Sequence, residues 1–165
     1  MKTPVNITRV KMKELVLILD RLRSAHNTGN IFRIAEALDA GVAACGYTPC
    51  PPHPKLEKTA MGTDKSVPCC HFESAGEAVD ALHEAGFLVL AAEPGGTEAW
   101  EADFRFPLAV IFGNEALGVS ADALEKVDGI VSLAMHGSKA SINVGNAVAA
   151  ITYVIDAKWQ NKLKI

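Results

Sequence analysis

Apolar runs alternate with mixed polar segments along this chain, at a spacing typical of strands that alternate with helices. The run LVLILD (15–20) predicts a fully buried strand, since its first five residues are all aliphatic. The apolar stretches VAACGY, FLVLAAE, PLAVIFG and VDGIVSLAM predict further strands at 42–47, 87–93, 107–113 and 127–135. Strands that are apolar on both faces belong to parallel sheets covered by helices.

Helices are predicted between these strands by amphipathic spacing and by end signals. IFRIAEALDA (31–40) has helical spacing and ends at Gly41. SAGEAVDALHEAG (74–86) begins with a Ser, has a Glu three residues later and closes on a glycine. A long C-terminal helix is predicted over 141–162, while four prolines in 48–58 predict a surface loop with neither strand nor helix. The fold class is therefore α/β, with a mostly parallel sheet flanked by helices.

Length and composition fit one domain over residues 1–165, because 165 residues with 49% hydrophobic content can bury a substantial core. The first residues, MKTPVNITRVKMKEL, lack the apolar region of a signal peptide. No apolar run is long enough to span a bilayer. The sequence therefore predicts a cytoplasmic protein without a membrane partner.

The four cysteines raise the question of disulfides or of a zinc site with His53 or His71. No C-x2-C pair is present, however, and Cys69 and Cys70 are adjacent. Strand-like residues flank the cysteines, which favours buried free thiols. We therefore expect no metal site.

The net charge of −3 conceals an uneven distribution along the chain. Residues 1–33 carry a local charge of +5 and the remainder −8. The basic residues of this segment are Lys2, Arg9, Lys11, Lys13, Arg21, Arg23 and Arg33. The segment, and above all the basic 1–14 stretch, predicts phosphate contacts beside the first polar cluster; the alternative is a solvated terminus whose charges only aid solubility.

Three polar and glycine-rich clusters interrupt the apolar runs, at 26–33 (HNTGNIFR), 111–120 (IFGNEALGVS) and 141–150 (SINVGNAVAA). Polar side chains in such surroundings are costly unless they are hydrogen-bonded or used by a ligand. Each cluster follows a predicted strand, and ligands of parallel sheets bind beyond the carboxyl ends of the strands. The three clusters therefore predict one ligand pocket.

Several familiar ligand sites are disfavoured by the absence of their motifs. No G-x-G-x-x-G follows any strand, and no G-x-x-x-x-G-K-[ST] is present, which disfavours dinucleotide binding and P-loop hydrolysis. A serine hydrolase also lacks support, because there is no G-x-S-x-G elbow. Periodicity alone does not identify the ligand.

The clusters carry a resemblance to a known family. N-x-G-x-x-x-R (27–33), F-G-N-E-x-x-G (112–118) and S-I-N-V (141–144) resemble the three ordered motifs of SpoU-type, TrmH-like RNA ribose 2′-O-methyltransferases of the SPOUT class. Order, spacing and position near strand ends all match, from about residue 15 to the C-terminus, and KTAMG (58–62) resembles the central region of the family more weakly.

The resemblance implies a fold, a cofactor and partners that the pattern itself does not show. It implies an α/β fold with a C-terminal trefoil knot, S-adenosylmethionine as cofactor, a homodimer and an RNA substrate, either tRNA or rRNA. General topology rules run against a knot, so that expectation rests on the family alone. We expect no separate RNA-binding domain of the kind found in some relatives, and therefore expect the basic N-terminal segment to recruit the RNA.

Arg33 is the candidate for catalysis in the first motif. Methyl transfer to a 2′-hydroxyl requires alignment of oxygen, methyl and sulfur and the removal of a weakly acidic proton. A guanidinium keeps its proton, so we expect Arg33 to clamp an RNA phosphate and to support activation of the hydroxyl. The alternative is an ordinary surface arginine on the first helix.

The resemblance assigns further catalytic positions to Asn27, Glu115, Ser141 and Asn143. Asn27 is expected to hold the loop or the ribose, or to cap a helix that starts near Gly29. Glu115 is expected either to orient substrate or to pin the motif loops by accepting backbone N–H bonds, with the second role favoured. Ser141 and Asn143 are expected to line the site, although Ser141 could simply cap the last helix.

Cofactor contacts are expected from the motif loops, at positions that match the cofactor-binding loops of relatives: Gly113, Asn114, Leu133, Met135 and Ile142. The competing interpretation for Leu133 and Ile142 is plain core packing.

The chain departs from the usual family pattern at three places. It has Leu-Ala-Met (133–135) for Ile-Pro-Met, Ala116 for a glycine and Gly145 for a serine. The lost proline is expected to loosen one cofactor loop without removing binding. The function predicted is methyl transfer to a ribose 2′-hydroxyl; the rival is a non-catalytic RNA- or nucleoside-binding protein with the same fold.

Overall fold

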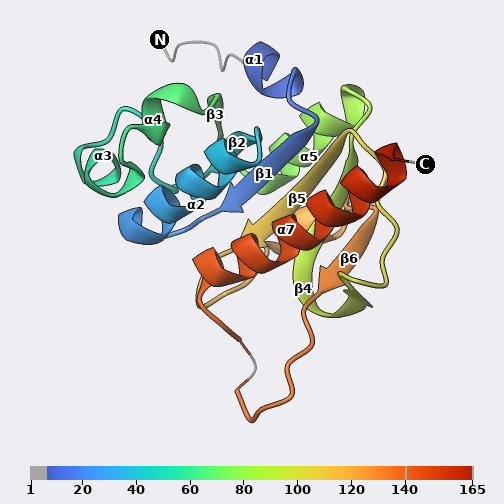
Figure 1. Ribbon diagram of the computed structural model, residues 1–165. Helices are drawn as coiled ribbons and strands as arrows, with labels where there is room; N and C mark the ends of the chain where they lie inside the picture. The colour runs from blue at the N-terminus through green and yellow to red at the C-terminus, as the bar shows by residue number, and fades with distance from the viewer. Residues whose placement is uncertain (1–6, 140, 165) are drawn as a thin grey trace.

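The computed structural model describes residues 7–139 and 141–164, and the strands in this part of the chain form one six-stranded parallel sheet (Figure 1). The strand order is β3-β2-β1-β5-β4-β6. The strands are β1 (Leu15–Asp20), β2 (Gly41–Cys45), β3 (Cys69–Phe72), β4 (Leu88–Glu98), β5 (Leu108–Gly113) and β6 (Gly129–Ser132). The helices are α1 (Ile7–Lys11), α2 (Ala25–Ala37), α3 (Pro54–Ala60), α4 (Thr63–Ser66), α5 (Ala75–Glu84), α6 (Ala121–Leu124) and α7 (Val144–Leu163).

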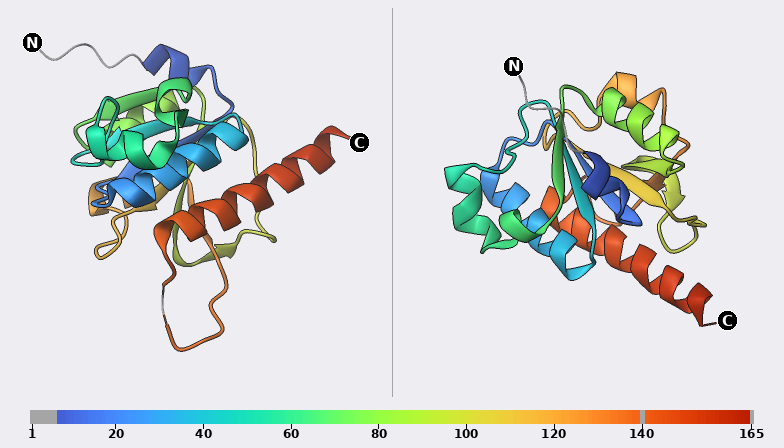
Figure 2. Two further views of the ribbon diagram at one scale, coloured as in Figure 1. Left: turned by 60° about the vertical axis from the view of Figure 1, so that its left-hand side comes forward. Right: turned by 90° about the horizontal axis from the view of Figure 1, so that it is seen from above.

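Side chains of the central strand alternate between two cores. Leu15, Leu17 and Leu19 of β1 belong to the core shared with α2, α3 and α7, whereas Val16 and Ile18 belong to the core shared with α1, α5 and α6. Helices therefore cover both faces of the sheet, with α2 and α7 on one face and α5 on the other (Figures 1 and 2). The α/β fold class is confirmed, and so are all five predicted strands.

The sheet also contains a strand that the sequence pattern missed. β3 has only four residues, Cys-Cys-His-Phe, and three of them are half-buried because it is an edge strand. It pairs in parallel with β2, from Val42 opposite Cys69 to Cys45 opposite Phe72. A short edge strand with a mixed sequence gives too little periodicity to be recognised.

The prediction of a plain loop over 48–58 was wrong for its second half, where α3 begins at Pro54. Proline suits the first position of a helix, because the N–H it lacks would have no partner there. The His53 side chain accepts a hydrogen bond from the Leu56 N–H at 3.3 Å and so caps the helix.

Two helices begin at different residues from those predicted. α2 begins at Ala25 and not at 31, because the Ser24 hydroxyl accepts the Asn27 N–H at 3.0 Å. α7 begins at Val144, and Asn143 caps it by accepting the Gly145 N–H at 2.8 Å. Asn27 and Ser141 are therefore not caps.

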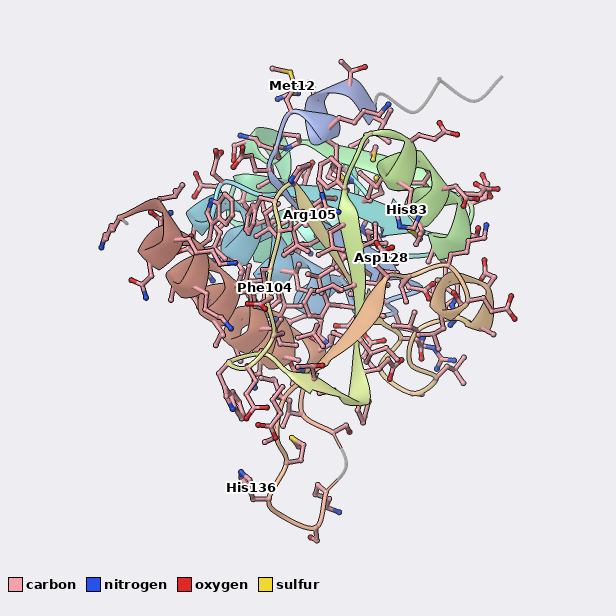
Figure 3. All side chains as sticks on the ribbon, turned by 90° about the vertical axis from the view of Figure 1, so that its right-hand side faces the viewer. Met12, His83, Phe104, Arg105, Asp128 and His136 are labelled. Atoms are coloured by element: carbon pink, nitrogen blue, oxygen red, sulfur yellow. The ribbon has the colours of Figure 1, made fainter. Side chains whose placement is uncertain are left out.

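Interactions at the edge of the core that α1, α5 and α6 share join the start of β6 to its neighbours. The Asp128 carboxylate, just before β6, contacts the His83 ring of α5 at 2.9 Å and accepts the Val89 N–H at 2.8 Å (Figure 3). Partial burial raises the pKa of Asp128, but the hydrogen bonds from Val89 and His83 outweigh it and leave the pKa below its usual value.

In the residues described, no helix combines the length and the apolar character needed to cross a membrane.

Gly29 of the first motif lies where α2 and α3 approach each other closely. A Cβ at this position would lie 1.9 Å from the Thr59 hydroxyl oxygen and 2.9 Å from the Thr59 carbonyl carbon. The Thr59 hydroxyl is held there, because it donates to the Ala25 carbonyl at 2.9 Å. The motif glycine therefore has a packing role.

We predict that Gly29→Ala lowers the free energy of unfolding by about 1–3 kcal/mol, because the added methyl group overpacks the contact between α2 and α3. Urea denaturation followed by circular dichroism measures the change. Gly137→Ala is the control, since a Cβ there meets nothing within 4 Å, and it should change stability by less than about 0.5 kcal/mol. Equal effects of the two substitutions would contradict the packing role.

Candidate functional site

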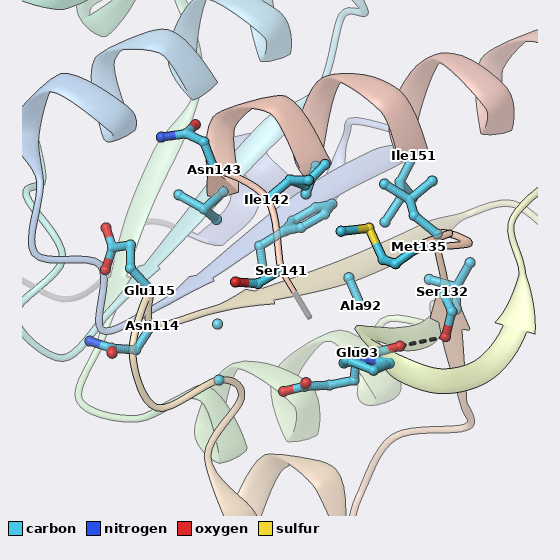
Figure 4. A pocket seen from close by; sticks show the side chains of 18 of the residues that line it. Ala92, Glu93, Asn114, Glu115, Ser132, Met135, Ser141, Ile142, Asn143 and Ile151 are labelled. Carbon is cyan, nitrogen blue, oxygen red and sulfur yellow. Dashed lines mark hydrogen bonds between the residues drawn. The ribbon is translucent and has the colours of Figure 1, made fainter. Parts of the chain in front are cut away.

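A pocket of about 700 Å³ lies at the carboxyl ends of β4, β5 and β6 and is closed by the start of α7 (Figure 4). Between β6 and α7, residues 133–139 extend beyond this edge of the sheet, with His136 far from the strands (Figures 1 and 3). Nine of the ten residues predicted for the site line the pocket: Asn27, Gly113, Asn114, Glu115, Leu133, Met135, Ser141, Ile142 and Asn143.

Asn114 is the buried polar centre of the site, with 3% of its surface exposed. Its side-chain oxygen accepts the N–H groups of Ala116 and Leu117, both at 2.8 Å. Its side-chain nitrogen donates to the Arg21 carbonyl at 2.7 Å and to the Tyr47 hydroxyl at 2.9 Å. The amide therefore joins the ends of β1, β2 and β5 and has all its bonding capacity satisfied.

The loop after β5 turns back on itself over the next few residues. The backbones of Asn114 and Gly118 exchange hydrogen bonds at 3.1 and 2.9 Å. A Cβ on Gly113 would lie 2.2 Å from the Gly118 carbonyl carbon, so a side chain cannot fit there. Gly113 lines the pocket, and the close approach that requires a glycine is to this loop itself.

Two carboxylates, Glu93 and Asp20, accept hydrogen bonds from the backbone at the end of the same loop. Glu93, at the end of the buried part of β4, accepts the Val119 N–H at 2.6 Å. Asp20, at the end of β1 and almost completely buried, accepts the Ser120 N–H at 2.7 Å and the Arg21 guanidinium at 3.1 Å. The Arg21 guanidinium also donates to the Gly118 carbonyl at 3.3 Å. The second motif is therefore held in place by backbone N–H bonds to both acids.

The polar side chains of the three motifs form a chain across the mouth of the pocket. Glu115 accepts the Arg23 N–H at 3.3 Å and faces the Asn27 side-chain nitrogen at 3.5 Å. The Asn143 side-chain nitrogen donates to the Asn27 side-chain oxygen at 3.1 Å. Asn27 therefore links the second motif to the third, and Glu115 links the second motif to the segment after β1.

Arg33 is the predicted site residue that the structure does not bring into the pocket. It is exposed on α2, six residues beyond Asn27, which is about 9 Å along the helix axis. Within residues 7–139 and 141–164, its guanidinium makes no hydrogen bond or ion pair. The side chain is available to a molecule that lies outside the pocket.

The basic N-terminal segment is divided between the two ends of the sheet. Arg23 follows the carboxyl end of β1 and lies beside Glu115. Lys11, in contrast, ends α1 ahead of the amino end of β1, and Lys13 there pairs with Asp39. The prediction that the whole segment lies beside the first polar cluster was therefore wrong for these two lysines, and Lys2 is outside the described residues.

The walls of the pocket fit the expected cofactor. Ile142 and Met135 are 45% and 38% exposed although their side chains are large and apolar, and both point into the concavity beside Ile151 (Figure 4). A pocket of this size, with apolar walls and a few polar groups, is typical of small-molecule sites and has room for S-adenosylmethionine. Among the described residues, no group of three or more His, Cys, Asp or Glu side chains could hold a metal ion.

Sequence reasoning missed several pocket residues. Ser132 is the last residue of β6 and Glu93 lies at the end of the buried part of β4. The Ser132 hydroxyl donates to the Glu93 carbonyl and accepts the Gly96 N–H. The strand-end rule that located the motifs would also have found Glu93, which follows an apolar run. Tyr47 carries no such signal, because only its hydrogen bond to Asn114 connects it to the site.

Comparison with known proteins decides the family. The sequence profile of the SpoU rRNA Methylase family matches residues 14–153. The chain belongs to the SpoU rRNA methylase family. The match covers all three motifs and every element from β1 to the middle of α7.

Two curated relatives of this SpoU chain have named activities. The chain is 34% identical over 157 residues to the 23S rRNA (uridine(2479)-2′-O)-methyltransferase of Streptomyces viridochromogenes, which covers 90% of this chain and 55% of the relative. It is 31% identical over 149 residues to the tRNA (guanosine(18)-2′-O)-methyltransferase of Thermus thermophilus, covering 89% and 76%. The chain thus spans about half the length of the Streptomyces relative.

A solved structure of the SpoU methyltransferase AviRb from Streptomyces viridochromogenes, in complex with the cofactor AdoMet, has the same fold. The TM-score is 0.85 at 30% identity, and the match covers 97% of this chain and 67% of that one. The fold of the SpoU family is therefore present from end to end of the described chain.

We predict that Asn114→Ala lowers the free energy of unfolding by about 2–4 kcal/mol, because the Arg21 carbonyl and two loop N–H groups lose their buried partner. Thermal unfolding measures the loss. Asn146→Ala is the matched control on the exposed first turn of α7, and it should change stability by less than about 0.5 kcal/mol. A stable Asn114→Ala protein would show that the amide is not what joins the strand ends.

Proposed function

We propose that this protein transfers a methyl group from S-adenosylmethionine to a ribose 2′-hydroxyl in tRNA or rRNA. The observation that carries the proposal is the assembly of all three motifs around one apolar-walled pocket, in a chain of a family whose curated relatives are named 2′-O-methyltransferases. The AdoMet complex of AviRb, which shares the fold, supports the choice of cofactor. RNA of these classes is found in the cytoplasm, where we expect the protein to act.

The proposed cofactor site consists of the apolar wall and the loop after β5. Leu133, Met135 and Ile142 would cover the adenine and its ribose, and the backbone at Gly113 and the Asn114 loop would form the floor. When bound, S-adenosylmethionine supplies an electrophilic methyl group on a sulfonium. Holding that group in a water-poor slot keeps the reacting geometry fixed.

We propose that the polar residues of the pocket position the substrate ribose. Asn27 is hydrogen-bonded to both Glu115 and Asn143 across the mouth, so it restrains both side chains where the substrate ribose would enter. Ser141 lines the same mouth and is exposed. We propose that these groups orient the 2′-hydroxyl in line with the methyl group.

Arg33 is proposed to bind an RNA phosphate near the reacting ribose. Its exposure and its lack of any partner in the described residues support this role, since an unpaired guanidinium suits bidentate contact with phosphate. Arg23, exposed beside Glu115, is proposed as a second phosphate contact. These arginines take the recruiting role that sequence reasoning gave to the entire N-terminal segment.

We further propose the knot and the homodimer that are typical of the family. In support of the knot, residues within 113–118, 131–135 and 141–147 line the same pocket. The dimer needs a surface other than the apolar face of 147–155, because Val148, Ile151 and Ile155 are already buried in the core. Within 147–155, Tyr153 is the large apolar residue that stays exposed, at 51%, and we propose it as part of that surface.

A non-catalytic RNA-binding protein is the rival proposal. A protein that only binds RNA has no need for an apolar-walled pocket whose opening is lined by Asn27, Glu115 and Asn143. Incubation of the protein with labelled S-adenosylmethionine and RNA from cells lacking the gene tests the enzyme directly. Mass spectrometry of the digested RNA then locates any new 2′-O-methyl nucleoside, and the absence of transfer to any RNA would favour the rival.

For the cofactor, we predict that Ile142→Asp weakens binding of S-adenosylhomocysteine by about tenfold or more, because a charge replaces an apolar wall that contributes roughly 1.5–3 kcal/mol when covered. Isothermal titration calorimetry measures the affinity. Met12→Asp is the control, since Met12 is exposed and does not line this pocket. An unchanged affinity in Ile142→Asp would show that the cofactor does not bind against Ile142.

For Arg33, we predict that Arg33→Ala lowers methyl transfer by about two orders of magnitude or more while cofactor affinity stays unchanged, because the side chain is outside the pocket. Arg33→Lys should restore little, since lysine keeps the charge and loses the planar fork. Glu36→Ala, also exposed on α2, is the control. Near-normal turnover by Arg33→Ala would return Arg33 to the status of a surface residue.

A further inference from the structure

Two cysteines that are far apart in the sequence lie side by side in the fold. Cys50 belongs to the irregular segment between β2 and α3, and Cys69 is the first residue of β3. Their sulfur atoms are 3.6 Å apart, and both residues are half-buried. Cys45 and Cys70, in contrast, are fully buried in the core that also holds α5.

The strand geometry explains which thiol Cys50 can meet. Neighbouring residues of a strand point to opposite faces, so Cys69 and Cys70 diverge. Cys69 packs against the core that contains α2 and α7, whereas Cys70 belongs to the core on the other face. Only Cys69 is therefore directed at Cys50.

We propose that Cys50 and Cys69 form an oxidisable thiol pair, which a small hydroperoxide converts into a disulfide. Cys50 is the thiol that reacts first and Cys69 is the thiol that resolves the intermediate. The site is separate from the cofactor pocket, since neither cysteine lines it. The proposal does not depend on the methyltransferase function.

The environment gives the two thiols different acidities. The hydrogen bond from Cys69 lowers the pKa of Cys50 to about 7, against the opposing effect of burial and with help from the nearby His71. The same hydrogen bond, together with burial, raises the pKa of Cys69 well above its ordinary value. Burial also raises the pKa of Cys70 to about 12, so neither it nor Cys45 competes as a nucleophile.

The reaction balances with one hydroperoxide molecule. The Cys50 thiolate attacks one peroxide oxygen, the O–O bond breaks, and a sulfenic acid forms at Cys50 while hydroxide leaves and takes up a thiol proton. The Cys69 sulfur then attacks the Cys50 sulfur, the S–S bond forms, the S–O bond breaks, and a second water leaves with the remaining proton. Two thiols lose two electrons, and hydrogen peroxide becomes two waters.

The movement required is small and falls on Cys50. A disulfide bond is about 2.05 Å long, so the sulfur atoms must approach by roughly 1.5 Å. Cys69 is fixed in the β3–β2 ladder, opposite Val42. Cys50 lies outside the helices and strands, and the Thr48 hydroxyl, two residues before it, donates to the Leu19 carbonyl at 3.0 Å. The irregular segment can therefore carry its sulfur to Cys69.

The segment that would move also reaches the candidate active site. Tyr47 is three residues before Cys50, and its hydroxyl accepts the bond from Asn114. A disulfide would draw this segment closer to β3. Hydrogen exchange of the Asn114 side-chain amide with solvent reports separately whether the bond between Asn114 and Tyr47 is altered.

The experiment treats the reduced full chain with a few equivalents of hydrogen peroxide, followed by alkylation, digestion without reductant and mass spectrometry. We expect one cross-linked pair of peptides, Cys50 with Cys69, while Cys45 and Cys70 are recovered alkylated after denaturation. In untreated folded protein, iodoacetamide should label Cys50 first, with a rate that rises with pH around a midpoint near 7.

Three variants test the pairing. Cys50→Ser should abolish the cross-link, and Cys70→Ala, beside Cys69 on the same strand, should retain it. Cys69→Ser, which keeps a hydrogen-bond donor beside Cys50 but cannot form a disulfide, should leave Cys50 as a trapped sulfenic acid that a dimedone probe captures. Recovery of four free thiols after peroxide, a cross-link to Cys45 or Cys70, or preferential labelling of any other cysteine would overturn the proposal.

Discussion

The buried side chain of Asn114 is the interaction on which the rest of the site depends. Three strands end side by side at the carboxyl edge of the sheet, and each would diverge into its own loop without a common partner. The amide bonds to the backbone after β1, to the Tyr47 hydroxyl after β2 and to its own loop after β5. Because buried polar groups are costly when unpaired, the loops cannot separate without losing several bonds at once.

The strand framework could be predicted from the sequence because buried parallel strands are nearly continuous apolar runs. The site could be predicted for the same reason, since polar clusters at strand ends stand out against those runs. The exceptions have specific physical causes. α3 was missed because prolines lie before and at its start, although a proline suits the first position of a helix. β3 was missed because it is too short and too polar to give a recognisable alternation of apolar and polar residues. The start of α2 depends on Ser24, a cap that lies before the apolar pattern begins.

Side-chain positions outside the backbone pattern were harder to predict. Arg33 belongs to a motif whose other members meet at the pocket, yet helical geometry carries it away from Asn27 and leaves it exposed. The basic N-terminal segment is continuous in sequence, but the length of β1 separates Arg9, Lys11 and Lys13 from Arg21, Arg23 and Arg33. Cys50 and Cys69 meet only because β3 lies beside β2. Pairwise proximity of this kind requires the tertiary fold.

The order of strands in the sheet has a consequence for how the chain reaches its native state. β1 pairs with β5, so that Leu15 lies opposite Leu108, and the pocket is closed only when the start of α7 arrives. Contacts between residues so distant along the chain slow folding, because loops must close before the contacts stabilise anything. During synthesis the pocket therefore forms only after the start of α7 has been made. A ligand that binds the pocket stabilises only chains that include α7, so ligand concentration raises the apparent melting temperature of such chains alone.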